Sequence, residues 1–423
     1  MASAEVIRQL KRAFHEDDAS EVQRMLQEHS ELRAMVNEPV GPFDSPAILN
    51  AKSRAMVDVL LGAGADINAK SRWWAGGFGL LHVADPELAS YAIGRGAVVD
   101  AHAAARLGLI SELERLLGAD PSLVHSRGGD GQMPLHFAQT REVADLLLRS
   151  GADIDARDID HESTAVQYMV RDRQPLAQYL VQEQGAASDI LMAVALGDLD
   201  LVETHLRARP ESIRMRVNNE HFPMCGDSRA GGTIYQWALG WHQSAHEIAR
   251  DFKREEIAGL LRARSSDEVL LLAAGWAGDA DEARRLREKD SGLLQRLSPE
   301  ERRMLAHAAR NNQLSAVRAF LAGGFPVDTR GQHQGTALHW AAFHGNKEMT
   351  RTLLASGASL EVVDADFSAT PLGWAVHGSE QGWHVRTGDF AGCVELLLSA
   401  GASVDAWNGS GSEPVRMLLR RNR

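Results

Sequence analysis

The sequence predicts an all-α fold in which short helical hairpins stack side by side into a solenoid. The chain has 423 residues, more than the roughly 250–300 at which a single globular core stops growing. Glycines that end helical patterns recur at a fixed interval, since Gly64 and Gly96 are 32 positions apart. In residues 332–364 two short apolar patterns at helical spacing flank a tight reversal. Neither helix could bury its apolar face alone, so stacking against neighbouring hairpins is expected.

The stretch at 332–364, QHQGTALHWAAFHGNKEMTRTLLASGASLEVVD, is the clearest copy of the repeating unit. Thr336 is a residue type that caps a helix N-terminus through its hydroxyl. Gly345 allows the chain to reverse, and Gly357 ends the second helix with the residue that best tolerates positive φ. The apolar positions are Leu338, Ala341 and Ala342 in the first helix and Met349, Leu353 and Leu354 in the second.

The run Thr336-Ala337-Leu338-His339-Trp340-Ala341 resembles the T-P-L-H-x-A motif of ankyrin repeats, whose period is about 33 residues. Met133 to Ala138 and Thr370-Pro371-Leu372 resemble the same motif. Ala337 stands where the family prefers proline, and Gly373 replaces the histidine of the later copy. The resemblance covers nearly the whole chain and implies an ankyrin-type helical solenoid with short β-turn or hairpin connections. It also implies that His136 and His339 brace neighbouring turns.

The chain in order is predicted to form one solenoid with two interruptions. Its final helix should run from Glu413 to Arg421, where apolar residues recur at helical spacing after two glycines. The predicted parts are an N-terminal cap (1–40), a first repeat block (41–214), an insertion (215–243), a second repeat block (244–407) with an insertion at 379–389, and a C-terminal cap helix (408–423).

The charge and cysteine content restrict the classes of partner and cofactor. The formal net charge is −12, which disfavours nucleic acid and anionic membranes and favours a neutral or basic protein or peptide. Cys225 and Cys393 are too few for a disulfide framework and form no CxxC pair. The longest apolar runs, such as 190–196, are far shorter than the roughly 18 residues of a membrane span. The sequence therefore predicts a cytoplasmic protein without a secretory signal, a membrane span or a cofactor.

Residues in equivalent positions of stacked repeats form columns on one surface. The column two residues before each helix reversal contains Trp276, Arg310, Phe343 and His377. In ankyrin repeats this position resembles a variable partner-contact site on the concave side. Exposed aromatic and histidine side chains are typical of binding hot spots, so this column and the adjacent His344 are predicted to bind a partner.

A second column contains His307, Trp340 and Trp374, at spacings of 33 and 34 residues. These side chains are expected to lie between adjacent repeats. Two readings stay open for the tryptophans, because aromatic residues at helical spacing usually fill a core but can also line a binding surface.

The two insertions are rich in aromatic and histidine residues that a spacer would not need. Either they form a lip over the groove, or they fold back and pack their aromatics against the solenoid. The residues concerned are His221, Tyr235, Trp237, Trp241 and His242 in the first insertion and Trp383, His384 and Arg386 in the second.

Motifs for metal binding and catalysis are incomplete. His242 and His246 have the spacing of two ligands on one helix face, but no third ligand is identifiable, and Arg250 replaces the second histidine of HExxH. The loop from Gly226 to Thr233 approaches a phosphate-binding pattern, yet Gly232 occupies the lysine position. We therefore predict no metal site and no nucleotide hydrolysis.

The function predicted from sequence is a protein- or peptide-binding module that uses its concave face. The alternative is an enzyme or binder of a small cyclic molecule, with a His/Trp-lined pocket under the insertions at 215–243 and 379–389. In that alternative His377, His384 and Asp389 are the catalytic candidates. The predicted binding residues are Tyr235, Trp237, Trp241, Trp276, Arg310, Phe343, His344, Trp374, His377, Trp383, His384 and Arg386.

Overall fold

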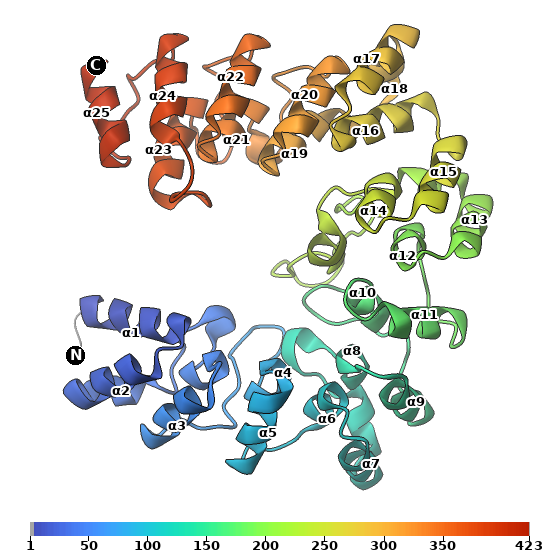
Figure 1. The fold of residues 1–423 in the computed structure, drawn as a ribbon, viewed down its shortest axis with the longest axis vertical. Helices are drawn as coiled ribbons and strands as arrows, with labels where there is room; N and C mark the ends of the chain where they lie inside the picture. The colour runs from blue at the N-terminus through green and yellow to red at the C-terminus, as the bar shows by residue number, and fades with distance from the viewer. Residues whose placement is uncertain (1–3, 423) are drawn as a thin grey trace. The chain divides into compact units, whose positions relative to one another are not determined.

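The computed structural model describes residues 4–422, and short α-helices joined by turns make up most of that range (Figure 1). Extended pairing among these residues is limited to three isolated β-bridges. The predicted all-α class is therefore confirmed. Within the described range, no helix combines the length and the apolar character needed to cross a bilayer.

The contacts of the chain fall into two compact units, which are described separately. Unit 1 contains the described residues up to Val202 together with 216–243, and unit 2 contains 203–215 together with the chain from Ser244 onward. The sequence suggested a single solenoid whose first repeat block ends at residue 214. In the structure the contacts of the first insertion place residues 216–243 in unit 1, whereas residues 203–215, just before it, belong to unit 2.

Unit 1 is a succession of helical hairpins, and after the first hairpin the first helix of each is shorter than the second. A further helix, α13 (Leu199–Ala208), begins in unit 1 and ends in unit 2. The helices wholly in unit 1 are α1 (Ala4–Glu16), α2 (Ala19–Glu28), α3 (Arg54–Gly62), α4 (Leu80–Val83), α5 (Pro86–Gly94), α6 (Ala101–Leu107), α7 (Ile110–Ala119), α8 (Pro134–Phe137), α9 (Arg141–Arg149), α10 (Ala165–Met169), α11 (Gln174–Gln182) and α12 (Ile190–Leu196).

Unit 2 repeats the same hairpin, and its last helix has the bounds that the sequence predicts. Its helix α21 packs against both α19 and α23. The helices are α14 (Ala245–Asp251), α15 (Glu255–Arg264), α16 (Asp267–Ala277), α17 (Ala280–Lys289), α18 (Leu293–Arg296), α19 (Met304–Arg310), α20 (Leu314–Ala322), α21 (Ala337–Phe343), α22 (Lys347–Ala355), α23 (Pro371–Gln381), α24 (Phe390–Ser399) and α25 (Glu413–Arg421).

The hairpin at 332–364 shows why this sequence forms the unit. Gly345 has φ of +64° at the reversal, and Gly357 has φ of +82° after α22. Asn346 caps α22 by accepting the backbone N–H of Met349 at 2.9 Å. Thr336 is the N-cap residue of α21, as predicted, and forms a capping box with His339, whose Nδ1 lies 2.9 Å from the Thr336 hydroxyl. The N–H of Thr336 also donates to His339 Nδ1, at 3.1 Å.

The motif histidines brace adjacent turns, as predicted. With its Nδ1 accepting a backbone N–H, each ring carries its proton on Nε2 and donates it to the next turn. His339 donates to the carbonyl of Ala369 at 3.2 Å, and His136 donates to the carbonyl of Ser163 at 3.1 Å. Burial lowers the pKa of both histidines to about 4, so both are neutral at pH 7.

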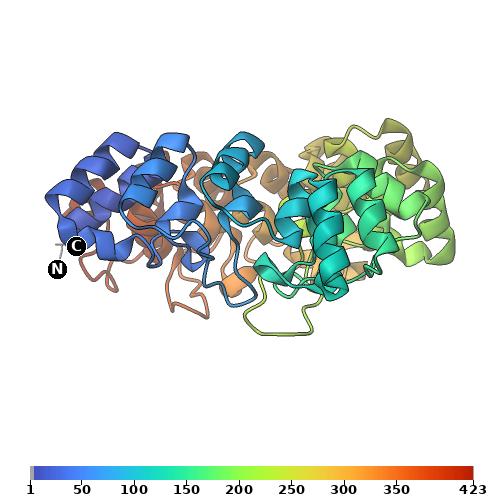
Figure 2. The same ribbon diagram turned by 90° about the horizontal axis from the view of Figure 1, so that it is seen from below.

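The first insertion folds onto unit 1 and is closed at its base by backbone pairing. Val217 N–H donates to the carbonyl of Gln243 at 3.0 Å, and His242 N–H donates to the carbonyl of Val217 at 2.8 Å. A single π-helical turn occupies Gln236–Gly240. In Figure 2 the yellow-green loop in the first half of this insertion extends beyond the helices of unit 1.

Each unit contains one pair of consecutive turns with the same backbone, at 128–164 in unit 1 and 331–370 in unit 2. Asp130 and His333 occupy equivalent positions with φ of 56° and 58°. In each turn pair an arginine guanidinium donates to two carbonyl groups, Arg127 to those of Gly131 and Arg157, and Arg330 to those of Gln334 and Val363.

A buried aspartate organises the second turn of each pair. Asp158 accepts the Tyr168 hydroxyl at 2.9 Å, and Asp364 accepts the Trp374 indole N–H at 2.8 Å. Each aspartate also accepts backbone N–H groups from its own turn. The two turn pairs are thus one template that carries different side chains.

Candidate functional site

The candidate site is a cavity in unit 2 that we call the aromatic pocket. Its volume is about 310 Å3, and its walls come from the 331–370 turn pair, from α21 and α23, and from the second insertion. The residues that line it are His333, Trp340, Phe343, Phe367, Ala369, Gly373, Trp374, His377 and Trp383.

Three tryptophans fix the shape of the aromatic pocket. The ring centroids of Trp340 and Trp374 are 4.9 Å apart with an interplanar angle of 84°, an edge-to-face contact. Trp383 lies 5.8 Å from Trp340, and it meets Phe343 edge-to-face at 5.3 Å. Asp364 accepts the indole N–H of Trp374 at 2.8 Å, which orients the ring that forms the rear wall of the pocket.

The mouth of the aromatic pocket exposes large apolar side chains. Phe367 is 65% exposed and Trp383 is 60% exposed, whereas Trp340 and Trp374 are buried. Opposite Phe367, His333 Nδ1 lies 2.6 Å from a carboxylate oxygen of Asp366. Aromatic residues gathered around a partly buried pocket are typical of binding hot spots.

Arg310, at the end of α19, lies against two walls of the pocket. Its guanidinium carbon is 5.6 Å from the ring centroids of both Trp340 and Trp383, within the range of cation–π contacts. Burial lowers the pKa of Arg310. Among residues 4–422 it forms no ion pair, and its Nε is buried without a hydrogen-bond acceptor. The Trp340 indole N–H is buried without an acceptor as well.

The structure brings together most of the residues predicted in unit 2. Arg310, Phe343, Trp374, His377 and Trp383 lie in or against the aromatic pocket. Trp340 and Trp374 are both buried, and both also line the aromatic pocket. The two roles considered for them, filling the core and lining a binding surface, are therefore compatible. The second insertion begins later than predicted, because α23 continues to Gln381.

Trp276 and His344, which the sequence predicts to face a partner from the exposed column, are buried. Trp276 is only 4% exposed and packs edge-to-face on Phe320, with centroids 5.6 Å apart. His344 is 2% exposed, and its Nε2 lies 2.8 Å from the carbonyl oxygen of Arg310. Burial lowers the pKa of His344 to about 4. The expectation that these two side chains face a partner is wrong.

The three catalytic candidates do not form an acid–base arrangement. Asp389 caps α24 by accepting the Gly392 N–H at 2.8 Å, and it lies 3.5 Å from the Lys347 ammonium. His384 packs on His344 with ring centroids 5.1 Å apart, and His377 is at the pocket wall. Within the described chain no hydrogen bond or ion pair connects these three residues.

Sequence reasoning missed His333 and Phe367. Arg386, which the sequence predicts to be a binding residue, is exposed. The missed residues lie in turns, where the helical spacing that identified the columns does not apply. Aligning residues 128–164 with residues 331–370 position by position would have identified them. Arg386 makes no hydrogen bond or ion pair among residues 4–422.

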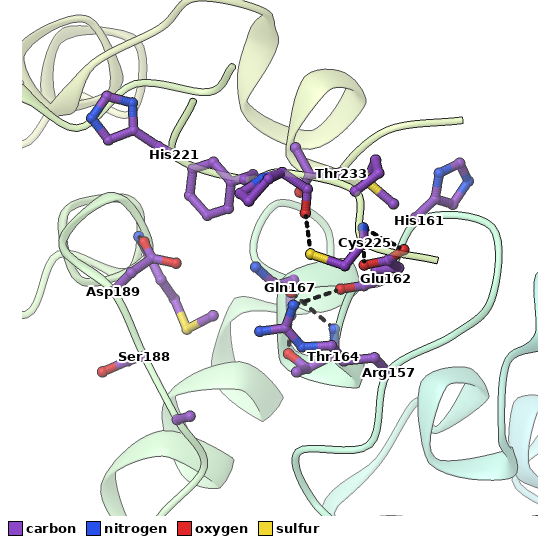
Figure 3. Close-up of a pocket in the computed structure, with 15 residues that line it drawn as sticks. Arg157, His161, Glu162, Thr164, Gln167, Ser188, Asp189, His221, Cys225 and Thr233 are labelled. Atoms are coloured by element: carbon purple, nitrogen blue, oxygen red, sulfur yellow. Dashed lines mark hydrogen bonds between the residues drawn. The ribbon is translucent and has the colours of Figure 1, made fainter. Parts of the chain in front are cut away.

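A second cavity, of about 380 Å3, lies in unit 1 under the first insertion (Figure 3). We call it the polar pocket, because charged and hydroxyl side chains surround it. The Glu162 carboxylate accepts the backbone N–H groups of Cys225 and Gly226 at 3.0 and 2.6 Å. The lining residues are Arg157, His161, Glu162, Thr164, Gln167, Ala187, Ser188, Asp189, Met192, His221, Phe222, Pro223, Met224, Cys225 and Thr233.

The aromatics of the first insertion have separate roles. Tyr235 is fully buried and its hydroxyl donates to Asp189 at 3.0 Å, so the expectation that it contacts a partner is wrong. Trp237 is 60% exposed and meets the His161 ring at 4.8 Å. Trp241 is half-buried beside His242, with ring centroids 5.4 Å apart. For this insertion the structure shows the folded-back alternative, with a pocket beneath it.

Comparison with known families agrees with this architecture. A family model described as ankyrin repeats in three copies matches residues 270–364 and 305–408, and a single ankyrin-repeat model matches 130–159. These matches identify the chain as an ankyrin-repeat protein over residues 130–159 and 270–408. The matched regions include both members of the turn-pair template in unit 2 and most of the one in unit 1. Ankyrin repeats generally mediate protein–protein interactions.

Relatives share only parts of this ankyrin-repeat chain. It is 33% identical over 98 residues to palmitoyltransferase Hip14 of Drosophila melanogaster, covering 23% of this chain and 14% of that protein. It is 27% identical over 192 residues to the E3 ubiquitin-protein ligase XB3 of Oryza sativa subsp. japonica, covering 37% and 43%. A human ankyrin repeat, SAM and basic leucine zipper domain-containing protein is 32% identical over 117 residues, covering 27% and 23%. The chain thus spans less than half the length of each.

Proposed function

We propose that unit 2 is a peptide-binding module that holds one extended segment of a protein partner at the aromatic pocket. The segment inserts a bulky apolar side chain between Trp374 and Trp383. A volume of about 310 Å3 is at the small end of ligand pockets, which suits one side chain rather than a large cofactor. The single observation that carries the proposal is this pocket, with Phe367 and Trp383 exposed at its mouth.

The segment also presents a carboxylate, from an acidic residue or a C-terminus, next to the apolar side chain. Arg310 supports this, because a half-buried guanidinium without an ion-pair partner is unfavourable unless a ligand supplies the anion. The unpaired indole N–H of Trp340 supplies a second donor nearby. The net charge of −12 still favours a partner that is neutral or basic overall, so the anionic group is local.

The pocket residues on α21 and α23 come from the first helices of successive repeats, the helices that the sequence assigned to the concave side. The exposed mouth favours a macromolecular partner over a small cyclic molecule, which an enclosed cavity would hold better. Cys225 and Cys393 are free thiols. They support a reducing compartment, which we propose is the cytoplasm.

The test is selection of peptides from a random display library on the full chain. We expect enrichment of a bulky apolar residue beside an acidic residue or a free C-terminus. Trp383→Ala should weaken binding of the selected peptide by about 30-fold or more, as for a hot-spot residue. Arg310→Gln should remove the preference for the carboxylate and leave the apolar preference in place.

The matched control is Trp237→Ala, which removes an equally exposed tryptophan from unit 1. Its affinity for the selected peptide should equal that of the unmodified chain. If selected peptides bind Trp383→Ala and Phe367→Ala as tightly as the unmodified chain, the aromatic pocket is not the binding site and the proposal fails.

A further inference from the structure

A cluster of three side chains in unit 1, Asp130, Asp160 and His161, is separate from the aromatic pocket. One potential ligand atom from each residue lies within 4.8 Å of the others. His161 Nε2 is 3.9 Å from a carboxylate oxygen of Asp130 and 3.9 Å from one of Asp160. Asp160 is 3% exposed and His161 is 9% exposed. His161 also lines one edge of the polar pocket (Figure 3).

The tautomer of His161 is fixed by the first insertion. Its Nδ1–H donates to the carbonyl of Gly232 at 2.8 Å, so the lone pair of the neutral ring is on Nε2, the atom nearest both carboxylates. Among the described residues Nε2 has no hydrogen-bond partner. A histidine whose far nitrogen is held by a backbone carbonyl is typical of metal ligands, because that bond orients the ring and raises its basicity.

The two carboxylates are held in place but not neutralised. Asp160 accepts the Trp73 indole N–H at 2.9 Å and the Gly231 N–H at 2.9 Å. Asp130 has one carboxylate oxygen that is buried without any partner. In the described chain, no lysine or arginine forms an ion pair with either residue. The two carboxylates thus lie close together in a largely buried place without a lysine or arginine counter-charge, an arrangement that a bound cation would stabilise.

We propose that Asp130, Asp160 and His161 bind a first-row divalent cation, with Zn2+ as the reference ion. One imidazole nitrogen and two carboxylate oxygens are ligands that Zn2+ accepts, at about 2.0–2.2 Å. Tetrahedral ligands at such distances are about 3.4 Å apart, so the 3.9 Å separations must close by about half an ångström. The ion would link the 128–131 turn to the 158–163 turn, whose His161 is held by the insertion at Gly232.

A second His/Asp cluster in unit 1 provides a contrast. His82 Nε2 lies 2.9 Å from Asp100, whose carboxylate also accepts Lys70 at 3.1 Å and the Ala103 N–H at 2.9 Å. His102 Nε2 donates to the carbonyl of Ser126 at 3.0 Å. These groups satisfy one another, so no counter-charge is missing and no ion is required.

The experiment measures zinc uptake by the full chain after treatment with a chelator, using equilibrium dialysis, elemental analysis and calorimetry. We expect one zinc ion per chain, with affinity reduced on the order of 100-fold in both Asp130→Asn and His161→Phe. Asn tolerates the positive φ at 130, and Phe is the residue found at the equivalent position of unit 2. Asp366→Asn, at the equivalent turn, is the matched control and should bind zinc normally.

Hydrogen exchange on the unmodified chain provides a measurement that does not depend on variants. Zinc should slow amide exchange in 128–131, 158–163 and 231–237, and Mg2+ at the same concentration should not. The proposal is overturned if the chain takes up no zinc. It is equally overturned if both variants bind zinc as the unmodified chain does, or if zinc protects the region around His82 and His102 instead.

Discussion

The turn pair at 128–164 in unit 1 and the turn pair at 331–370 in unit 2 have the same backbone but different side chains at the same positions. Asp130 in the first is His333 in the second, and His161 is Phe367. In unit 2 the exchange lets His333 pair directly with Asp366 at 2.6 Å, which leaves Phe367 available to an apolar ligand. In unit 1 it leaves two carboxylates facing one imidazole nitrogen. The comparison teaches that the repeat supplies a scaffold and that a few turn residues decide which chemical groups it presents.

The insertions follow the same division. The first insertion contributes backbone groups to the unit 1 turn pair, through the Gly231 N–H and the Gly232 carbonyl. The second contributes the side chain of Trp383 to the unit 2 turn pair. Backbone dipoles orient polar ligands, whereas an indole adds apolar contact area. Each insertion therefore adds groups of the kind that its turn pair already presents, polar groups in unit 1 and aromatic surface in unit 2.

The largest expected effect is that of Trp374→Ala in unit 2. This change empties the rear wall of the aromatic pocket and leaves Asp364 without its indole donor, so it should lower the free energy of unfolding by about 3–5 kcal/mol. Trp383→Ala should change it by less than about 1 kcal/mol, because that side chain is largely exposed. Urea denaturation followed by circular dichroism measures both. If Trp374→Ala and Trp383→Ala destabilised the chain equally, the distinction between a buried rear wall and an exposed mouth would be wrong.

The equivalence of Asp158 and Asp364 is tested by replacing each with alanine. Asp158→Ala leaves two backbone N–H groups and the Tyr168 hydroxyl without an acceptor. Asp364→Ala leaves three backbone N–H groups and the Trp374 indole N–H without one. Each change should destabilise its unit by about 1–3 kcal/mol. Asparagine retains one acceptor oxygen and should cost less at both positions. Hydrogen exchange reports each unit separately, and a large effect in one unit with none in the other would break the equivalence.

Acid should destabilise both units through their motif histidines. Burial lowers the pKa of His136 and His339 to about 4, so between about pH 4 and 6.5 the unfolded chain binds more protons than the folded chain. Stability is therefore full above pH 6.5 and is lost as the pH falls toward 4. The loss from pH 7 to pH 5 should be on the order of 1–2 kcal/mol per histidine.

Denaturation midpoints across this pH range provide the measurement, and His339→Gln is the diagnostic variant. It should be less stable at pH 7, with a flatter pH dependence for unit 2 only. An unchanged slope in unit 2 would show that His339 is not the group that titrates.

The smallest expected effect is that of Arg386→Ala. This exposed side chain has no partner among residues 4–422, so the unfolding free energy should change by less than about 0.5 kcal/mol. The affinity for a selected peptide should also change little, unlike that of Arg310→Gln. A loss of affinity as large as that of Arg310→Gln would extend the site along the second insertion.

Local patterns in the sequence were sufficient to predict the fold. The glycines at 345 and 357 and the apolar spacing of the last helix act within a few residues, so their consequences can be predicted from the sequence. The column through Arg310, Phe343 and His377 was identified for the same reason. Periodicity places helical residues reliably. The motif histidines bond turns that lie 27 and 30 positions further along the chain, and their role was predicted from the resemblance to ankyrin repeats.

The errors arise where contacts between repeats decide the outcome. At the position of Gly275 a Cβ atom would come within 2.1 Å of the Phe320 ring, so the glycine admits that ring, which then covers Trp276. His344 is buried between repeats, where its Nε2 contacts the carbonyl oxygen of Arg310 in the preceding repeat. Tyr235 is buried because its hydroxyl reaches Asp189, which is 46 positions earlier in the chain. None of these contacts follows from spacing along one helix.

The central claim is that one turn-pair template supports two different sites, and hydrogen exchange on the full chain with each ligand tests it most directly. Zinc should protect 128–131, 158–163 and 231–237, and a selected peptide should protect 333–343 and 367–383. Each ligand should leave the other turn pair unchanged. Protection of the same turn pair by both ligands, or of neither by its own ligand, would contradict the claim.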